Sequence, residues 1–317
     1  MKPESHKKNV IFPLLTGAIL LIAAGSTAFL LSSYSTANHS QTTSMEWPDS
    51  LSRECDNMPP SWLWCEDFEE ERSYSYSSGK ADRQKQKGVN QSYGAAFHFS
   101  EKERSGGGFR VAFGRNPSHN FEPVDLGMRD YREIYWRQFV YLPEGWEGNG
   151  ADKLSRATII TDKNWSQAMI AHVWSGKDPG PKSHYLTIDP ASGVNENSQV
   201  VTTKYNDFSN LRWLGYKTGS TPIFAKEQFG HWHCVEAYVR LNDPGKQNGL
   251  FRLFINDKLE AERDDLNWVG TYKDYGINAI FFENYWNAGS PVAQTRYFDN
   301  IVISQEPIGC GKPEHKK

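Results

Sequence analysis

The sequence predicts an all-β fold, a sandwich of two antiparallel sheets preceded by one hydrophobic N-terminal helix. Three observations predict it. Short runs of alternating or β-rich residues recur along most of the 317-residue chain. Turn sequences such as SGGG, SGKDPGPK and NDPGKQNG separate these runs. Beyond the N-terminal segment, no long stretch has the sustained periodicity of an amphipathic helix.

The N-terminal helix is expected in the uncharged segment Val10–Leu31, VIFPLLTGAILLIAAGSTAFLL. Its length matches the ~20 residues of a membrane-spanning helix, and the basic residues before it predict a cytoplasmic N-terminus. The small residues at 35–37 also form a tolerable cleavage site, which is typical of a secretory signal. Residues 1–33 are therefore expected to be a signal peptide or a membrane anchor. Both alternatives place the remainder in the extracellular space, in the periplasm or on the cell surface.

The exported part is expected to contain one large domain. Residues 34–50 are rich in Ser and Thr and poor in core residues, which is typical of a linker. The sandwich is expected over residues 51–311 and a polar tail over 312–317. Each strand should show one apolar face and one variable face, because the two sheets share a core. The expected strands are 95–100, 108–114, 132–142, 157–161, 168–174, 184–188, 199–205, 232–242, 250–256, 277–285 and 296–304.

The composition argues against one class of partner. The net charge is −3 and Lys and Arg are scattered, so no basic field indicates binding to nucleic acid or to an anionic membrane surface. Membrane contact is expected only through the N-terminal segment. Aromatic residues make up 14% of the chain, with 11 Trp. In an all-β chain such rings either line a sugar-binding surface or build a Trp-rich core, and the composition leaves both open.

Four cysteines in an exported domain predict disulfides. Four cysteines allow three pairings. Cys55 and Cys65 flank a short Pro-containing turn, CDNMPPSWLWC, so a local bridge between them is the economical pairing. Cys234 and Cys310 would then tie a central strand to the C-terminus. The alternative is a set of four free, buried thiols.

Several motifs together resemble a known superfamily. They are CEDFEEE, YWRQFVYLPEGWEG, KLSR, AMIAHVW, HWHCVEAYVRLNDPGKQNG, FRLFINDKLEAER, IFFENYW and YFDNIVIS. In order and spacing this set resembles the concanavalin A-like jelly-roll superfamily, and within it the polysaccharide lyases of the alginate and glucuronan lyase type. The resemblance covers roughly Cys55 to Cys310. It implies a jelly-roll sandwich, a polysaccharide as substrate or ligand, and no catalytic cofactor.

A lyase that acts on a uronic acid neutralises the C6 carboxylate, removes the C5 proton with a base and protonates the O4 leaving group. The resemblance implies His or Tyr as base and acid, with Arg, Lys, Asn or Gln around the carboxylate. By motif position His172 is the candidate base and Arg137 the candidate carboxylate clamp. Lys153 in KLSR is a further catalytic candidate, although SR stands where related lyases carry a PG-like pair.

The remaining candidates come from neighbouring strands. Tyr185 in SHYLTI and Tyr285 in ENYWN are candidate proton donors, and each has the alternative of a packing residue. The strand from Trp232 carries an aromatic and charged face, and this face is expected to form part of the groove wall. The candidate substrate-binding residues are Glu236, Arg240, Asn284, Trp286, Trp174 and Tyr135.

Acidic residues at the start of the domain have two interpretations. Asp67, Glu69 and Glu71 alternate, as the carboxylates of a retaining hydrolase do. The resemblance favours a structural Ca²⁺ instead, held by Glu66 or Asp67 together with Asp299 of YFDNIVIS.

Two functions of different classes follow. The first is an exported lyase that cleaves a uronic acid-containing polysaccharide by β-elimination. The second is a non-catalytic, lectin-like module that uses the same aromatic groove. A lyase needs its base, clamp and acid within one sugar's width, whereas a lectin needs only stacking rings and scattered hydrogen bonds.

Overall fold

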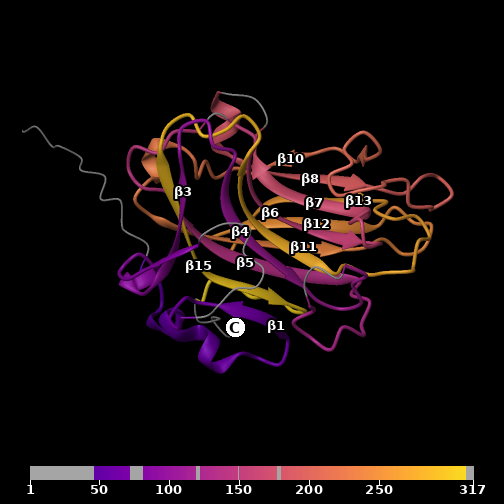
Figure 1. The fold of residues 1–317 in the computed structure, drawn as a ribbon, viewed down its shortest axis with the longest axis horizontal. Coiled ribbons are helices and arrows are strands. Elements are labelled where there is room, and N and C mark those ends of the chain that lie inside the picture. The colour runs from indigo at the N-terminus through magenta and orange to yellow at the C-terminus, as the bar shows by residue number, and fades with distance from the viewer. Residues whose placement is uncertain (1–45, 72–80, 119–121, 149, 177–179, 312–317) are drawn as a thin grey trace, which may run out of the picture. The chain divides into compact units, whose positions relative to one another are not determined.

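In the computed structural model, the described part of the chain comprises residues 46–71, 81–118, 122–148, 150–176 and 180–311. Its regular secondary structure consists of antiparallel strands in two sheets and a few short 3₁₀ segments (Figure 1). The two-sheet antiparallel sandwich predicted from the sequence is confirmed. No helix in these ranges is long and apolar enough to cross a membrane. The helix expected at Val10–Leu31 lies outside the described residues, as do the tail at 312–317 and most of the expected linker.

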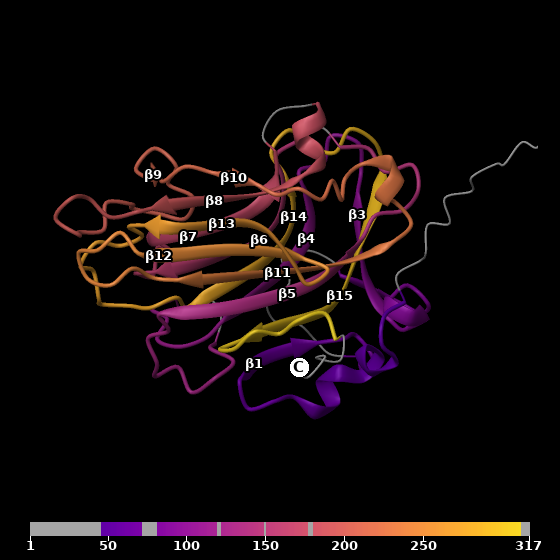
Figure 2. The same ribbon diagram turned by 180° about the vertical axis from the view of Figure 1, so that it is seen from behind.

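Sheet A contains eight of the described strands, in the order β13-β12-β11-β5-β15-β3-β2, with β1 paired to β15. Figure 2 shows β5, β11 and β12 side by side. The strands of sheet A are β1 (Trp62–Glu66), β2 (Asp82–Gln84), β3 (Gly94–Phe99), β5 (Glu133–Tyr141), β11 (Trp232–Arg240), β12 (Gly249–Ile255), β13 (Lys258–Leu266) and β15 (Gln294–Ser304).

Sheet B contains seven of the described strands, in the order β10-β8-β7-β6-β14-β4, with β9 paired to β8. Its strands are β4 (Ser105–Ala112), β6 (Asp152–Ile160), β7 (Gln167–Ser175), β8 (Leu186–Ser192), β9 (Arg212–Trp213), β10 (Lys217–Thr218) and β14 (Ala279–Trp286). One 3₁₀ segment, η1 (Asp49–Asn57), precedes β1, and three short ones lie between strands: η2 (Val89–Gln91), η3 (Pro181–His184) and η4 (Lys226–Gln228).

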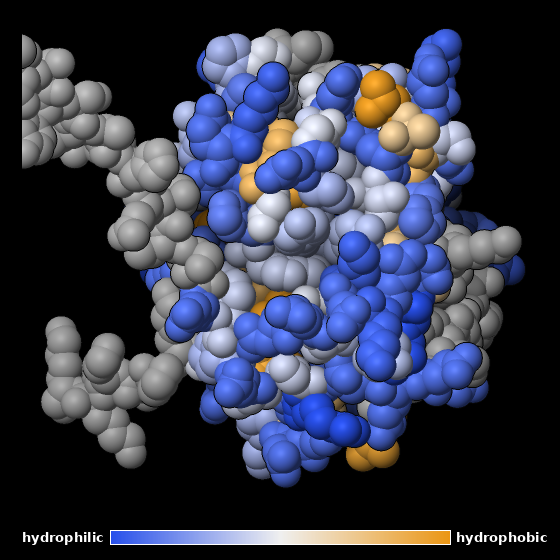
Figure 3. Space-filling view, turned by 90° about the vertical axis from the view of Figure 1, so that its left-hand side faces the viewer, coloured by the Kyte–Doolittle hydropathy of each residue, from blue (hydrophilic) through white to orange (hydrophobic). Residues whose placement is uncertain are grey.

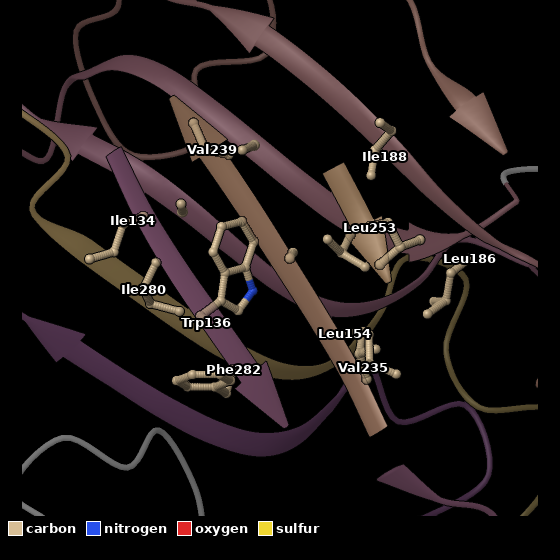
Figure 4. Close-up of a cluster of buried hydrophobic side chains, with 14 of the residues drawn as sticks. Ile134, Trp136, Leu154, Leu186, Ile188, Val235, Val239, Leu253, Ile280 and Phe282 are labelled. Atoms are coloured by element: carbon tan, nitrogen blue, oxygen red, sulfur yellow. The ribbon is translucent and has the colours of Figure 1, made fainter. Parts of the chain in front are cut away.

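The core lies between the two sheets and follows from the alternation of each strand. In Figure 4 the side chains of Ile134, Trp136 and Val235 from sheet A face those of Leu154 and Phe282 from sheet B. All five side chains are buried. The face seen in Figure 3 is mostly hydrophilic, with hydrophobic residues only in small, separate patches, so that face offers no extended apolar surface.

One expected strand is wrong. Residues 199–205 form a loop, with only an isolated bridge between Val194 and Val200. Side chains take the hydrogen bonds that a ladder would have used: Thr202 exchanges bonds with the backbone of Gln167, and Asp207 accepts from the backbone and hydroxyl of Thr203. β1, β2, β9, β10 and β13 are strands that the alternation did not single out.

The outer face of sheet A is covered by the ends of the domain. Cys234 on β11 is bonded to Cys310, and both are buried beside Leu51 of η1 and Phe139 of β5. The second bridge joins Cys55 to Cys65. Both predicted pairings are confirmed, and the described residues contain no free cysteine.

The two disulfides should stabilise the fold unequally. Cys234–Cys310 spans 76 residues of sequence and Cys55–Cys65 spans 10. In the chain-entropy model the long bridge contributes about 4.5 kcal/mol and the short one about 3 kcal/mol. We expect the Cys234→Ala/Cys310→Ala pair to lower the free energy of unfolding more than Cys55→Ala/Cys65→Ala does. Guanidinium unfolding of the two variants measures this, and the reverse order would contradict it.

Candidate active site

The outer face of sheet B carries several buried side chains that can bind charge or exchange protons. Its strands are central and buried, yet their outward side chains include Lys153, Arg156 and His172. Lys153 and Arg156 share this face because the pairing of β6 with β7 shifts between Lys153 and Ser155. A regular strand would send residues three apart to opposite faces, so this bulge puts two cations side by side.

A pocket of about 320 Å³ opens on this face. Strands β4, β6 and β14 form its floor, and the loop at 205–208 forms a wall. Arg110, Lys153, Glu283 and Tyr285 line it. Two cations and one carboxylate make the lining net positive, which favours an acidic ligand.

Lys153 and Tyr285 lie together in this pocket. The Nζ atom of Lys153 is 4.8 Å from the ring centroid of Tyr285 and 5.5 Å from that of Phe208. Lys153 is only 3% exposed. Burial lowers the pKa of its ammonium, the carboxylate of Glu283 opposes this shift and Arg156 adds to it. A buried lysine with a lowered pKa is suited to accept a proton.

Arg156 holds the wall of the pocket to its floor. Its Nη2 lies 2.9 Å from Oε1 of Glu283, and its Nη1 donates to Oδ1 of Asn206 at 2.6 Å. It also donates to the hydroxyl of Tyr205. Since Arg156 is fully buried, burial lowers its pKa, and the Glu283 carboxylate works against that shift. The charge-assisted hydrogen bond from Arg156 therefore fixes the orientation of the Glu283 carboxylate.

Arg110 is the more accessible cation of the pocket. Its guanidinium carbon lies 5.5 Å from the Trp165 ring and 5.8 Å from the Phe281 ring. Burial lowers its pKa, partly offset by Glu283. An arginine presents a planar fork of donors that matches a carboxylate.

His172 lies on the same face but beneath aromatic rings. Its ring stacks on Trp174 at 4.8 Å and on Trp213 at 5.6 Å between centroids, and Phe208 lies 6.3 Å away. Nδ1 of His172 donates to the carbonyl oxygen of Asp189 at 3.3 Å. His172 is 1% exposed, whereas Phe208 and Trp213 are about two-fifths exposed (41% and 37%). His172 therefore supports an aromatic shelf, with Phe208 and Trp213 as its surface.

Arg137 does not join this group, which corrects the expected pairing of His172 with Arg137. It lies on β5 of sheet A and points to the outer face of that sheet. There it pairs with Glu54 and donates to the carbonyl oxygens of Asn300 and Gly309. All of its surroundings are protein, and it is 1% exposed. The sheet to which a strand belongs depends on distant pairing, which alternation along the strand does not reveal.

Three candidate substrate-binding residues are also on sheet A. Glu236 accepts the backbone N–H groups of Ile308 and Gly309, which places it under the C-terminal segment. Tyr135 stacks on Tyr238 at 4.1 Å. Arg240 is exposed and donates to the carbonyl oxygen of Asn248. These residues are on the opposite side of the sandwich from the pocket, so the structure does not bring them to the expected groove.

Two further candidates point into the core from β14. Asn284 accepts a hydrogen bond from Arg296 at 2.6 Å. Trp286 is fully buried and stacks on Trp146 at 5.7 Å. They alternate with Glu283 and Tyr285, so one β14 face enters the pocket and the other enters the core. Tyr185 is half-buried just before β8 and does not line the pocket.

The acidic residues expected to hold Ca²⁺ do not form a fitting set. Oε1 of Glu66 accepts from the amide of Phe68, Asp67 accepts from the amide of Cys55, and Asp299 accepts from that of Val89. Among the described residues no group of three acidic, His or Cys side chains is placed to bind a metal.

The hydrolase alternative also loses its geometric basis. β1 ends at Glu66, so Asp67, Glu69 and Glu71 are not on one strand face. Glu69 instead accepts the amide of Tyr93 at 2.7 Å.

Comparisons with known proteins agree with this fold. The family model for polysaccharide lyase 14 matches residues 194–301, about a third of the chain. The solved structure of a marine alginate lyase from Aplysia kurodai has a TM-score of 0.50 at 12% identity, covering 76% of this chain and 98% of the other. Two further structures have TM-scores of 0.49 at 12% identity. One is a glucuronan lyase from the fungus Trichoderma reesei (77% of this chain, 96% of that), the other an alginate lyase from a Chlorella virus (73% and 93%). Among curated proteins no sequence matches the chain.

The chain resembles the polysaccharide lyases. The matched segment contains Trp213, Glu283, Tyr285 and the wall at 205–208, but not Lys153 or His172. Sequence reasoning singled out Lys153, Tyr285 and Trp174 on this face. It missed Arg110 and Glu283, although Glu283 alternates with Phe281 and Tyr285 in IFFENYW and was detectable there.

The buried charge of Lys153 should cost this lyase-like domain stability. Its pKa is lower in the folded than in the unfolded chain, so the cost is fully present below the folded pKa. It vanishes above the ordinary lysine pKa of about 10.4. We expect Lys153→Met to raise the free energy of unfolding at pH 7 by roughly 0.5–2 kcal/mol, with a smaller gain near pH 10.5. Urea unfolding at both pH values measures it.

Lys102→Met is the matched control, because the Lys102 side chain is 86% exposed. It should change stability at neither pH. A loss of stability in Lys153→Met at pH 7 would show that Lys153 is not under a desolvation cost.

Proposed function

We propose that this chain cleaves a uronic acid-containing polysaccharide by β-elimination in the pocket of sheet B. The observation that carries the proposal is the buried Lys153 amine beside Tyr285 in a net positive pocket. The fold resemblance to polysaccharide lyases supports it. The reaction needs a base, an acid and a carboxylate clamp, and the pocket offers a residue for each.

The roles follow from the chemistry of each side chain. Neutral Lys153 takes the C5 proton, since its lowered pKa increases the neutral fraction near physiological pH. Arg110 binds the C6 carboxylate and stabilises the charge that develops when the C5–H bond breaks. Tyr285 donates its hydroxyl proton to O4 as the C4–O4 bond breaks. A C4–C5 double bond forms, and the electron count balances without a cofactor.

The aromatic shelf supplies a place for the neighbouring sugar. Phe208 lines the pocket, and Trp213 lies 6.1 Å from it between ring centroids. A glycan chain leaving the pocket on this side crosses both exposed rings, whose flat faces suit the C–H face of a pyranose. The same shelf supports the second candidate, a lectin-like module that binds glycan without cleaving it.

Export remains part of the proposal. Two disulfides are consistent with an oxidising compartment. We propose that the segment at residues 10–31 directs the domain out of the cytoplasm, as a membrane helix or a cleaved signal.

Product formation separates lyase from lectin. We expect the domain to generate the ultraviolet absorbance of an unsaturated uronate on at least one of alginate, glucuronan, pectate or glycosaminoglycans. Lys153→Met and Tyr285→Phe should each lower kcat at least about 10²-fold while glycan binding persists. Lys102→Met should retain wild-type kcat. Binding to one of these glycans, with no absorbance rise on any of them, would contradict the lyase function and support the lectin-like one.

The shelf has its own test. Trp213→Ala should weaken glycan binding about tenfold, which corresponds to ~1.4 kcal/mol, because the exposed ring no longer covers a sugar face. Titration of a soluble oligosaccharide by calorimetry measures the affinity. Leu259→Ala is the control, since Leu259 is similarly exposed (47%) but lies on sheet A. Equal effects of the two substitutions would remove the shelf from the binding site.

A further inference from the structure

A buried arginine of sheet A reaches across the core to the strands that carry the proposed catalytic pair. Arg296 lies on β15 and is fully buried. Its Nε donates to Oδ1 of Asn284 at 2.6 Å, and its Nη1 to Oδ2 of Asp152 at 2.7 Å. Its Nη2 is 3.1 Å from the carbonyl oxygens of Lys153 and Glu283. All four acceptors belong to β6 or β14 of sheet B.

These acceptors lie where the ladder between β6 and β14 is irregular. The pairing runs from Phe282↔Ser155 to Tyr285↔Lys153, so three residue steps on β14 match two on β6. The irregular stretch contains Glu283 and Asn284. A bulge re-aims side chains but weakens the ladder that would hold them. Arg296 supplies hydrogen bonds to both strands across this irregular stretch.

We infer that Arg296 is a positioning residue that sets the relative placement of Lys153, Glu283 and Tyr285. It touches none of the reacting groups itself, because it lies on the core side of sheet B. It binds the backbone carbonyls of Lys153 and Glu283 and the side chain of Asn284, the residue between Glu283 and Tyr285. This inference rests on the proposed function only for its effect on kcat.

The guanidinium is suited to this task in a way that an ammonium is not. Its five donors are fixed in one plane, so the position of Asp152 determines the direction of the remaining bonds. Phe298, Trp146 and Phe99 surround the group, with ring centroids 5.4, 5.8 and 5.9 Å from its central carbon. The fork is therefore held rigidly, and a misplacement of about 1 Å at a catalytic group can cost about 10²-fold in rate.

Arg137 provides a matched control. It is also a buried arginine of sheet A, paired with a carboxylate and bonded to two backbone carbonyls. Its partners lie on the outer face of sheet A, away from the pocket. Arg296→Lys and Arg137→Lys each keep a charge and lose a planar fork. A general loss of stability therefore affects both, whereas a positional effect on the pocket affects only Arg296→Lys.

The experiment measures kcat, KM and amide hydrogen exchange for the wild type and both variants. We expect Arg296→Lys to lower kcat at least about tenfold with KM changed less than about twofold, since the shelf remains intact. Exchange at residues 152–154 and 283–286 should rise in Arg296→Lys only. Arg137→Lys should keep kcat within about twofold of the wild type. Wild-type kcat in a folded Arg296→Lys would overturn the inference, as would equal losses in the two variants.

If Arg296→Lys does not fold, a milder substitution tests the same inference. Asn284→Ala removes one of the four acceptors and should lower kcat about three- to tenfold with KM unchanged. If the wild type cleaves none of the polysaccharides, the proposed lyase function fails while the exchange contrast still decides the anchoring role. Faster exchange confined to residues 152–154 and 283–286 would support that role, and unchanged exchange there would overturn it.

Discussion

Face-to-face packing of two antiparallel sheets is the constraint on which the rest of this structure depends. It gives each strand one side committed to the shared core and one side that faces outward. On sheet A, η1 and the C-terminal segment cover part of the outward side around Phe139 and Cys234, and Cys234–Cys310 ties the C-terminal segment to β11. On sheet B the outward side stays open at a pocket. The location of the proposed chemistry follows from which sheet the ends of the domain cover.

The open face of sheet B carries an unusual amount of buried positive charge. Burial lowers the pKa of Lys153 and Arg156 on the face, and of Arg296 beneath it. Buried cations of this kind cost stability unless each is paired. Arg156 pairs with Glu283 and Arg296 pairs with Asp152, whereas among the described residues Lys153 forms no ion pair and its ammonium lies beside the rings of Phe208 and Tyr285. The least compensated of these charges is thus the one in the pocket, and a buried charge kept at a cost in stability is typical of a functional site.

Alternation along the chain was enough to predict the sandwich and most of its strands, because burial on one face leaves a period of two in the sequence. The resemblance, and not the alternation, singled out Lys153 and Tyr285, and Lys153 lay outside the expected strand at 157–161 although it belongs to β6. Alternation did not show that Arg137 faces away from the pocket, nor that Arg156 lies on the same face as Lys153. Which sheet holds β5, and the bulge that turns Arg156 to the face of Lys153, depend on pairings between distant segments. The wall at 205–208 was missed for a related reason, since side-chain hydrogen bonds replace its ladder.

The assignment of the base moves from His172 to Lys153 on geometric grounds. A base has to reach the proton that it removes, and the His172 ring is covered by Trp174 and Trp213 while its Nδ1 is bound to a backbone carbonyl. Lys153 instead lines the pocket and lies beside a tyrosine. The histidine keeps a part in the proposed binding of glycan, because its ring supports the exposed Trp213. The outward row of β7 thereby supports the shelf, while the adjacent row of β6 presents Lys153, the proposed base.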